Sequence, residues 1–93
     1  MSARPPGRRS RKTYRSGPRR SEDLGPALVR LGRRVRSLRT DRGLTQAKLA
    51  EVAELDEKHL QVIERGETNV TVSTLLALAK ALEVSLSEMF EEV

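Results

Sequence analysis

Residues 45–66 read TQAKLAEVAELDEKHLQVIERG, and this stretch contains two short runs with helical spacing. Thr45 and Asp56 are typical N-cap residues that each precede a run with helical spacing. We therefore expect helices over residues 46–53 and 57–65, joined by a tight turn of only a few residues. Two short helices joined in this way can place one helix in a DNA major groove while the other crosses the phosphate backbone. Many helical bundles have equally short connections, so the spacing alone is suggestive rather than decisive.

Helical spacing continues on both sides of this stretch. Pro26 suits the first turn of a preceding helix and Gly43 suits its end. Ser85 and Glu88 form a capping-box pattern at the start of a last helix. The apolar positions expected to face inward are Leu28, Leu31, Val35, Leu38, Leu49, Val52, Leu60, Ile63, Leu75, Leu78, Ala79 and Leu82. No segment alternates with a period of two, so the predicted fold is all-α, a compact bundle of five short helices.

Charge and apolar content divide the chain into two parts. Residues 1–23 carry a net charge of +6 and only three apolar residues, whereas residues 24–93 carry −1 and 31 apolar residues. The first part also contains several prolines, glycines and serines, so we expect a disordered, Arg-rich arm followed by a folded domain over residues 24–93. Such an arm can neutralise phosphates or lie in a minor groove. A solvated tail with no fixed role is the alternative interpretation.

The composition excludes several classes of protein. The chain has no cysteine and one histidine, His59, so we expect no disulfide, no metal site, no catalytic residues and no cofactor. No apolar run approaches the roughly 18 residues of a membrane span, and the N-terminus lacks the apolar stretch of a signal peptide. We therefore expect an intracellular protein without enzymatic activity, located in a prokaryotic cytoplasm at the nucleoid.

The residues that surround the two short helices carry a family resemblance. Residues 31–39, residues 43–50, the segment Ile63-Glu64-Arg65-Gly66 and residues 75–90 resemble a Cro/lambda-repressor-type helix-turn-helix domain, and the likeness covers about residues 28–91. Small restriction–modification controller proteins share the Glu-Arg-Gly sequence and the Asn-containing loop that follows. The resemblance implies a lambda-repressor-like fold and a sequence-specific DNA-binding transcriptional regulator, either a repressor or an autoregulator, with the controller proteins as a subtype.

The same resemblance implies roles for individual residues. Thr45 caps the second helix of the domain, and Gln46 hydrogen-bonds a phosphate at the N-terminus of that helix. Arg39 and Glu64 match a pair that braces the first helix against the third. The residues expected to contact the phosphodiester backbone are Thr45, Gln46, Arg65, Thr68 and Asn69.

Four positions of helix 57–65 correspond to the base-reading positions of the family. Glu57 can accept a hydrogen bond from cytosine N4, and Lys58 can donate to guanine O6 and N7. Gln61 can pair with adenine. Val62 lies off the helix face that carries Leu60 and Ile63, and it can pack on a thymine methyl group. A solvated helix surface is the alternative interpretation of each position.

Two departures from the family pattern leave a second function open. Glu54 stands at the turn position usually held by glycine, where a left-handed residue costs about 1 kcal/mol. Residues 43–93 carry a net charge of −6, which repels phosphate, whereas residues 28–42 carry +5. Either the arm and the first helix provide the positive charge that DNA binding needs, or the fold serves as a protein-interaction adaptor, coactivator or antirepressor.

The end of the chain has an apolar helical face. Its members are Leu86, Met89, Phe90 and Val93. In the family this end of the domain commonly forms a symmetric dimer, so we expect a homodimer on a two-fold symmetric operator with half-sites ~34 Å apart. The alternative is that this face packs onto the rest of a monomer. Double-stranded DNA, a second copy and a regulatory protein are the expected partners, and no small-molecule effector is expected.

Overall fold

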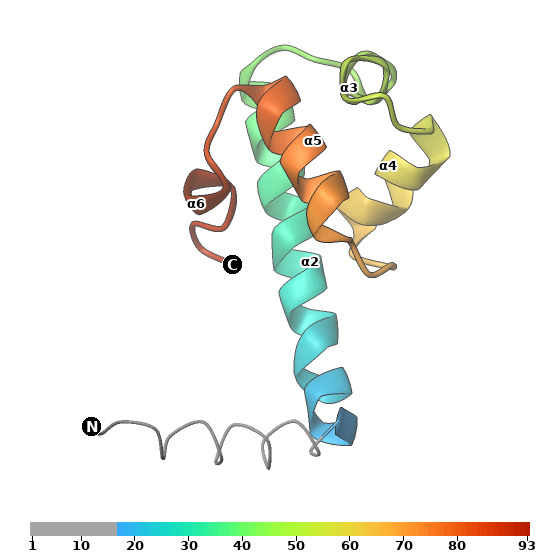
Figure 1. Ribbon diagram of the computed structural model, residues 1–93, viewed down its shortest axis with the longest axis vertical. Coiled ribbons are helices and arrows are strands. Elements are labelled where there is room, and N and C mark those ends of the chain that lie inside the picture. Colours follow the sequence, from blue (N-terminus) through green and yellow to red (C-terminus); the bar gives the residue numbers. More distant parts are fainter. Residues whose placement is uncertain (1–16) are drawn as a thin grey trace, which may run out of the picture.

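The computed structural model describes residues 17–93, with side chains from Leu24 onward. These residues form five helices and no strand, which confirms the all-α prediction (Figure 1). The helices are α2 (Gly17–Asp41), α3 (Gln46–Ala53), α4 (Glu57–Arg65), α5 (Val72–Leu82) and α6 (Leu86–Met89). None of them is long and apolar enough to cross a membrane.

The first helix begins earlier than expected. Helix α2 includes residues 17–23, which the charge pattern assigned to the arm, and Pro26 lies inside it rather than in its first turn. A proline inside a helix removes one N–H hydrogen bond, and its ring crowds the carbonyl four residues earlier. That end of α2 extends past the other helices, where water can solvate the carbonyl left without a partner (Figure 1). The predicted disorder of residues 1–16 lies outside the described residues.

The predicted N-caps Thr45, Asp56 and Ser85 are confirmed, and Thr71 caps the remaining helix, α5. In each case a side-chain oxygen accepts a hydrogen bond from a backbone N–H in the first turn, and the cap residues are Thr45, Asp56, Thr71 and Ser85. Ser85 and Glu88 complete the capping box, because the Glu88 carboxylate accepts a bond of 2.8 Å from the Ser85 N–H. That hydrogen bond holds the pKa of Glu88 below its usual value.

One hydrophobic core joins all five helices. Its buried members are Leu31, Val35, Leu38, Leu49, Ala50, Ala53, Leu60, Ile63, Leu75, Leu78, Ala79, Leu82 and Met89. Val52 was expected in this core, and that prediction is wrong, because its side chain is 50% exposed. The buried face of α3 is centred between Leu49 and Ala50, and Val52 lies about 110° around the helix from that centre.

Helices α2 and α4 approach each other closely at two glycines. A Cβ atom at Gly32 would lie 2.5 Å from the carbonyl oxygens of Ile63 and Glu64. Gly66, with a φ of 73°, ends α4 in the left-handed conformation, and a Cβ there would lie 2.5 Å from Cα of Val29. The C-terminal half of α4 is thus held against α2, which fixes the direction in which its N-terminal half projects.

Candidate DNA-binding surface

Helices α3 and α4 form the expected helix-turn-helix unit. The turn between them contains Glu54 in the left-handed conformation, with φ 59° and ψ 45°. The Leu55 N–H donates to the Ala50 carbonyl at 2.8 Å, and Asp56 then caps α4. Glu54 therefore adopts the conformation expected for the position that is usually glycine, at a cost of about 1 kcal/mol.

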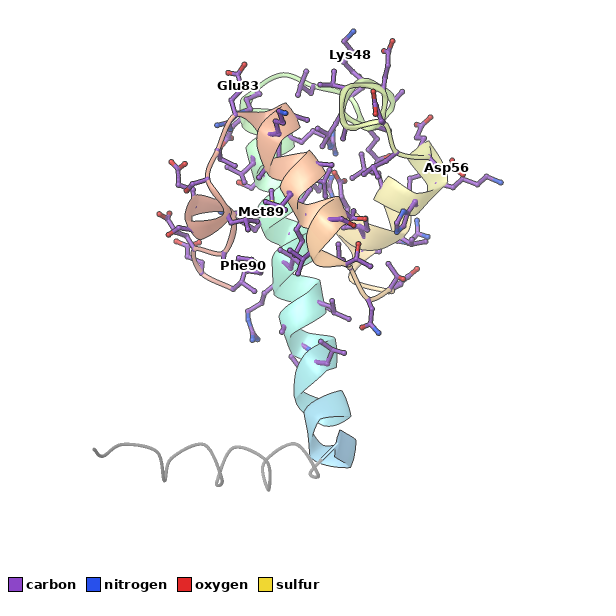
Figure 2. All side chains as sticks on the ribbon, viewed as in Figure 1. Lys48, Asp56, Glu83, Met89 and Phe90 are labelled. Carbon is purple, nitrogen blue, oxygen red and sulfur yellow. The ribbon has the colours of Figure 1, made fainter. Side chains whose placement is uncertain are left out.

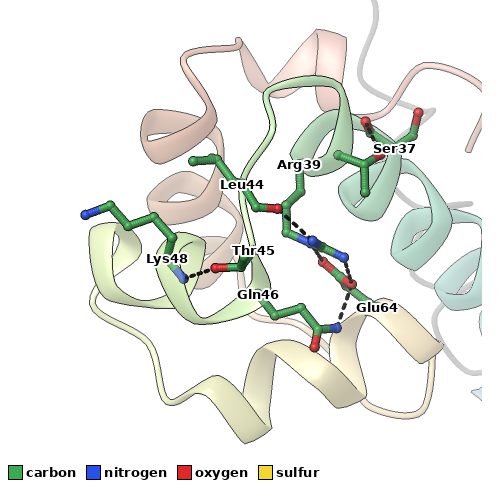
Figure 3. Close-up of polar contacts among 8 residues, drawn as sticks. Ser37, Arg39, Leu44, Thr45, Gln46, Lys48 and Glu64 are labelled. Atoms are coloured by element: carbon green, nitrogen blue, oxygen red, sulfur yellow. Dashed lines mark hydrogen bonds and ion pairs between the residues drawn. The ribbon is translucent and has the colours of Figure 1, made fainter.

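A buried ion pair braces α2 against α4, as predicted. The Arg39 guanidinium donates to both carboxylate oxygens of Glu64, from Nε to Oε2 at 2.7 Å and from Nη2 to Oε1 at 3.1 Å. Only 10% of the Arg39 side chain and 4% of the Glu64 side chain are exposed. Arg39 Nη1 also donates to the Leu44 carbonyl at 2.8 Å (Figure 3). One arginine thus holds both α4 and the segment that leads into α3.

The Gln46 side chain belongs to the same network. Its Nε2 donates to Glu64 Oε1 at 2.9 Å, although the two residues lie 18 positions apart in the sequence (Figure 3). No local pattern could have predicted this contact. A carboxamide nitrogen carries two hydrogens, so the second N–H of Gln46 can still donate to a phosphate. The contact also fixes which end of the amide faces inward, because an ionised carboxylate only accepts hydrogen bonds.

The four predicted base-reading side chains of α4 differ in exposure. Glu57 and Lys58, in its first turn, are exposed. Gln61 and Val62, one turn later, are half-buried, so the exposed apolar group expected at Val62 is partly covered. His59 is also half-buried. The N-terminal turn of α4 is therefore the part of the helix that is most accessible to a bound molecule.

The predicted phosphate contacts lie at two ends of the unit. Thr45 uses its side chain to cap α3, since its Oγ1 accepts from the Lys48 N–H at 3.0 Å. At the other end, Arg65 is exposed and pairs with Glu67 at 3.0 Å, a surface contact worth at most about 1 kcal/mol. Thr68 is half-buried and Asn69 is exposed in the loop that follows.

Two arginines on α2, and Arg42 directly after it, contact the C-terminal part of the chain instead of a DNA-facing surface. Arg30 donates to the Val93 carbonyl at 2.7 Å, and Arg34 donates to the Glu88 carbonyl at 2.8 and 3.0 Å. Arg42 donates to the Leu82 carbonyl at 2.6 Å. Figure 1 shows α6 and α4 on opposite sides of α2. The positive charge of residues 28–42 is thus less available to DNA than the sequence alone predicts.

The predicted apolar face at the C-terminus is mostly used within the monomer. Met89 is fully buried between α6 and helices α2 and α5, so its assignment to a dimer face is wrong (Figure 2). Leu86 and Val93 are half-buried against the core. Phe90, with 43% of its surface exposed, is the member of the set that still faces solvent.

Comparison with known proteins agrees with this geometry. A family model described as helix-turn-helix matches residues 35–89, which include the brace, the turn and every helix after α2. The chain belongs to the helix-turn-helix family.

Similar members of the family are regulators. The control protein C.SmaI of Serratia marcescens is 44% identical over 59 residues, which cover 63% of this chain and 70% of that protein. The immunity repressor protein of Bacillus phage phi105 is 42% identical over 62 residues, 67% of this chain and 43% of that protein. The crystal structure of the restriction-modification controller protein C.AhdI from Aeromonas hydrophila superposes with a TM-score of 0.67 at 43% identity, covering 68% of this chain and 96% of that one.

Proposed function

We propose that this protein is a sequence-specific DNA-binding transcriptional regulator that acts as a repressor or autoregulator and catalyses no reaction. The observation that carries the proposal is the buried Arg39–Glu64–Gln46 network, which ties the N-terminus of α3 to α4 and leaves Glu57 and Lys58 exposed. The likeness to a control protein and a controller protein favours the restriction–modification controller subtype.

In this proposal α4 enters the major groove with its N-terminal turn. Lys58 donates to a guanine and Glu57 accepts from a cytosine. Gln61 and Val62, one helical turn later, contact neighbouring base pairs. The N-terminus of α3 lies on a phosphate, which the free N–H groups of its first turn and the second N–H of Gln46 can bind. Arg65, Thr68 and Asn69 contact the backbone at the other end of α4.

The positive charge that DNA binding requires comes mainly from the N-terminal residues. Residues 1–23 carry +6, whereas residues 43–93 carry −6, and Arg30, Arg34 and Arg42 already bind backbone carbonyls. Arg33 and Arg36 remain exposed on α2. We propose that the N-terminal residues contribute affinity without sequence preference, while the acidic surface disfavours incorrect sites.

We further propose that the protein binds as a homodimer to a two-fold symmetric operator. One α4 helix offers few base contacts, and two copies related by a two-fold axis double their number on half-sites ~34 Å apart. A regulatory protein is a possible additional partner, and we place the protein in the cytoplasm with its DNA.

Selection of bound duplexes from a random pool tests this function directly. The full-length chain is used at ~150 mM salt, where charges more than about 8 Å apart are screened. Enrichment of a two-fold symmetric site supports the proposal, and Lys58→Ala in a parallel selection identifies the base pair that Lys58 contacts. A folded protein that enriches no sequence refutes it.

The acidic charge of residues 43–93 favours one rival, a protein-interaction adaptor or antirepressor. The two functions differ in salt dependence. A DNA-binding protein loses affinity with a log–log slope of about −0.9 per neutralised phosphate, whereas a protein-binding module lacks that dependence.

A further inference from the structure

Helix α2 carries a stripe of three positions that run alongside Glu64. Gly32, Arg36 and Arg39 follow the spacing i, i+4 and i+7, which places them on one face of the helix. A Cβ atom at Gly32 would lie 2.5 Å from the Glu64 carbonyl oxygen, and the Arg39 guanidinium bonds the Glu64 carboxylate. Both ends of the stripe therefore touch the same residue of α4, and Arg36 is the position between them.

Arg36 differs from Arg39 because its charged group is available to a ligand. Arg36 is exposed, whereas Arg39 is buried in its ion pair. Among the side chains that the structure describes, that of Arg36 takes part in neither a hydrogen bond nor an ion pair. A guanidinium presents five N–H donors in one plane, a geometry that matches the oxygens of a phosphate.

The network beside this stripe supplies hydrogen-bond donors but no net positive charge. The Arg39 guanidinium and the Glu64 carboxylate neutralise each other, and Gln46 is uncharged. Lys48, in the first turn of α3, pairs with Glu51 at 3.5 Å. A phosphate at the N-terminus of α3 therefore needs its counter-charge from another side chain.

Position and charge together assign this role to Arg36. It lies one helical turn before Arg39, about 4.5 Å along the axis of α2. We infer that Arg36 binds the DNA phosphate that lies at the N-terminus of α3, and that Arg36 and Gln46 form one phosphate-binding site. This inference rests on the proposed DNA-binding function. It adds a residue of α2 to the phosphate contacts, which otherwise lie at residues 45–46 and 65–69.

Arg33 provides a comparison on the same helix. It is exposed like Arg36, but it does not belong to the stripe that faces Glu64. It lines a groove of about 310 Å³ on the side of α2 that carries α6, together with Arg30, Arg34, Ser37, Glu91 and Glu92. The two carboxylates in that groove repel a phosphate. Arg33→Gln thus removes the same charge from the same helix without removing the proposed contact.

The salt dependence of binding to one duplex of mixed sequence tests the inference with the full-length chain. Arg36→Gln removes one phosphate contact, so the log–log slope against salt should become less steep by about 0.9. Between 50 and 200 mM salt, the wild type should therefore lose about 3.5-fold more affinity than Arg36→Gln. Arg33→Gln should keep the wild-type slope, and so should Arg36→Lys, which retains the charge. Circular dichroism verifies that every variant is folded.

A double-mutant cycle tests whether Arg36 and Gln46 share one phosphate. Arg36→Gln should weaken duplex binding less in a Gln46→Ala background than in the wild type, because the phosphate is then already less firmly held. Strictly additive losses would show that the two side chains bind separate phosphates and would overturn the shared site. Selection from a random pool should return the same sequence preference for Arg36→Gln as for the wild type, since a phosphate contact carries no sequence information.

The remaining outcomes separate this inference from the function on which it rests. An unchanged slope for Arg36→Gln, or equal changes for Arg36→Gln and Arg33→Gln, overturns the inference while duplex binding itself stands. An altered base preference of Arg36→Gln also overturns it, because Arg36 then contacts bases. A wild-type chain that binds no duplex in a salt-dependent way refutes the proposed DNA-binding function instead.

Discussion

Removal of the Glu64 carboxylate should destabilise the domain more than any surface substitution. In Glu64→Ala, Arg39 loses two charge-assisted hydrogen bonds of 2.7 and 3.1 Å, and Gln46 loses one of 2.9 Å. The loss of one partner of a buried ion pair costs 3–5 kcal/mol as a rough range. Because Arg39 keeps its bond to the Leu44 carbonyl, we expect about 3–4 kcal/mol.

That loss is a large part of the stability of a domain of this size. A domain of about 70 residues has a total stability on the order of 4–10 kcal/mol, so the variant should be only marginally folded at room temperature. Urea unfolding followed by circular dichroism measures the free energy of unfolding. The variant should lower the urea midpoint with little change in the slope of the unfolding free energy against urea.

A double-mutant cycle separates the ion pair from loss of packing. In Arg39→Met combined with Glu64→Leu, no charge is left without a partner, and the double variant should be more stable than the sum of the two single changes predicts. Single variants that each cost less than about 1 kcal/mol, or a strictly additive double variant, would show that Arg39 and Glu64 are not an energetically coupled brace.

Four further predictions concern packing, recognition, charge and pH. Gly32→Ala should lower the free energy of unfolding by about 1–3 kcal/mol, because its Cβ meets two carbonyl oxygens. The control is Gly25→Ala in the same helix, whose Cβ meets nothing within 4 Å and which should leave the stability unchanged or raise it. Chemical denaturation measures both variants. Lys58→Ala should relax the preference at one base pair by ~1–3 kcal/mol; equal weakening on every duplex would make Lys58 a phosphate contact instead. Deletion of residues 1–16 should weaken binding to all duplexes alike and flatten the salt slope, and a loss confined to the operator would contradict the electrostatic role. The pKa of Glu88 is lowered on folding, so Glu88 should stabilise the domain at pH values above its unfolded pKa. That contribution should be lost as the pH falls through the lower pKa of the folded state. In an NMR titration, Ser85→Ala should move the titration midpoint of Glu88 back toward its ordinary value.

Features that depend on near neighbours in the chain could be predicted from the sequence. The caps at Thr45, Asp56 and Ser85 were predictable because a side chain bonds an N–H two or three positions further along the chain. The left-handed turn at Glu54 followed from its position in the family pattern. Apolar spacing placed Leu75, Leu78 and Leu82 in the core, since a helix buries one continuous face.

The side of each helix that meets a given neighbour depends on tertiary packing. Spacing predicted that Val52 faces inward from α3, whereas packing against α5 buried Ala53 instead. It also allowed Met89 or Phe90 to be exposed at the C-terminus, and contact with α2 and α5 buried Met89. Hydrogen bonds such as those of Arg30, Arg34 and Arg42 join residues 40–63 positions apart. Such partners leave no periodic signal in the sequence, because chain folding alone brings them together.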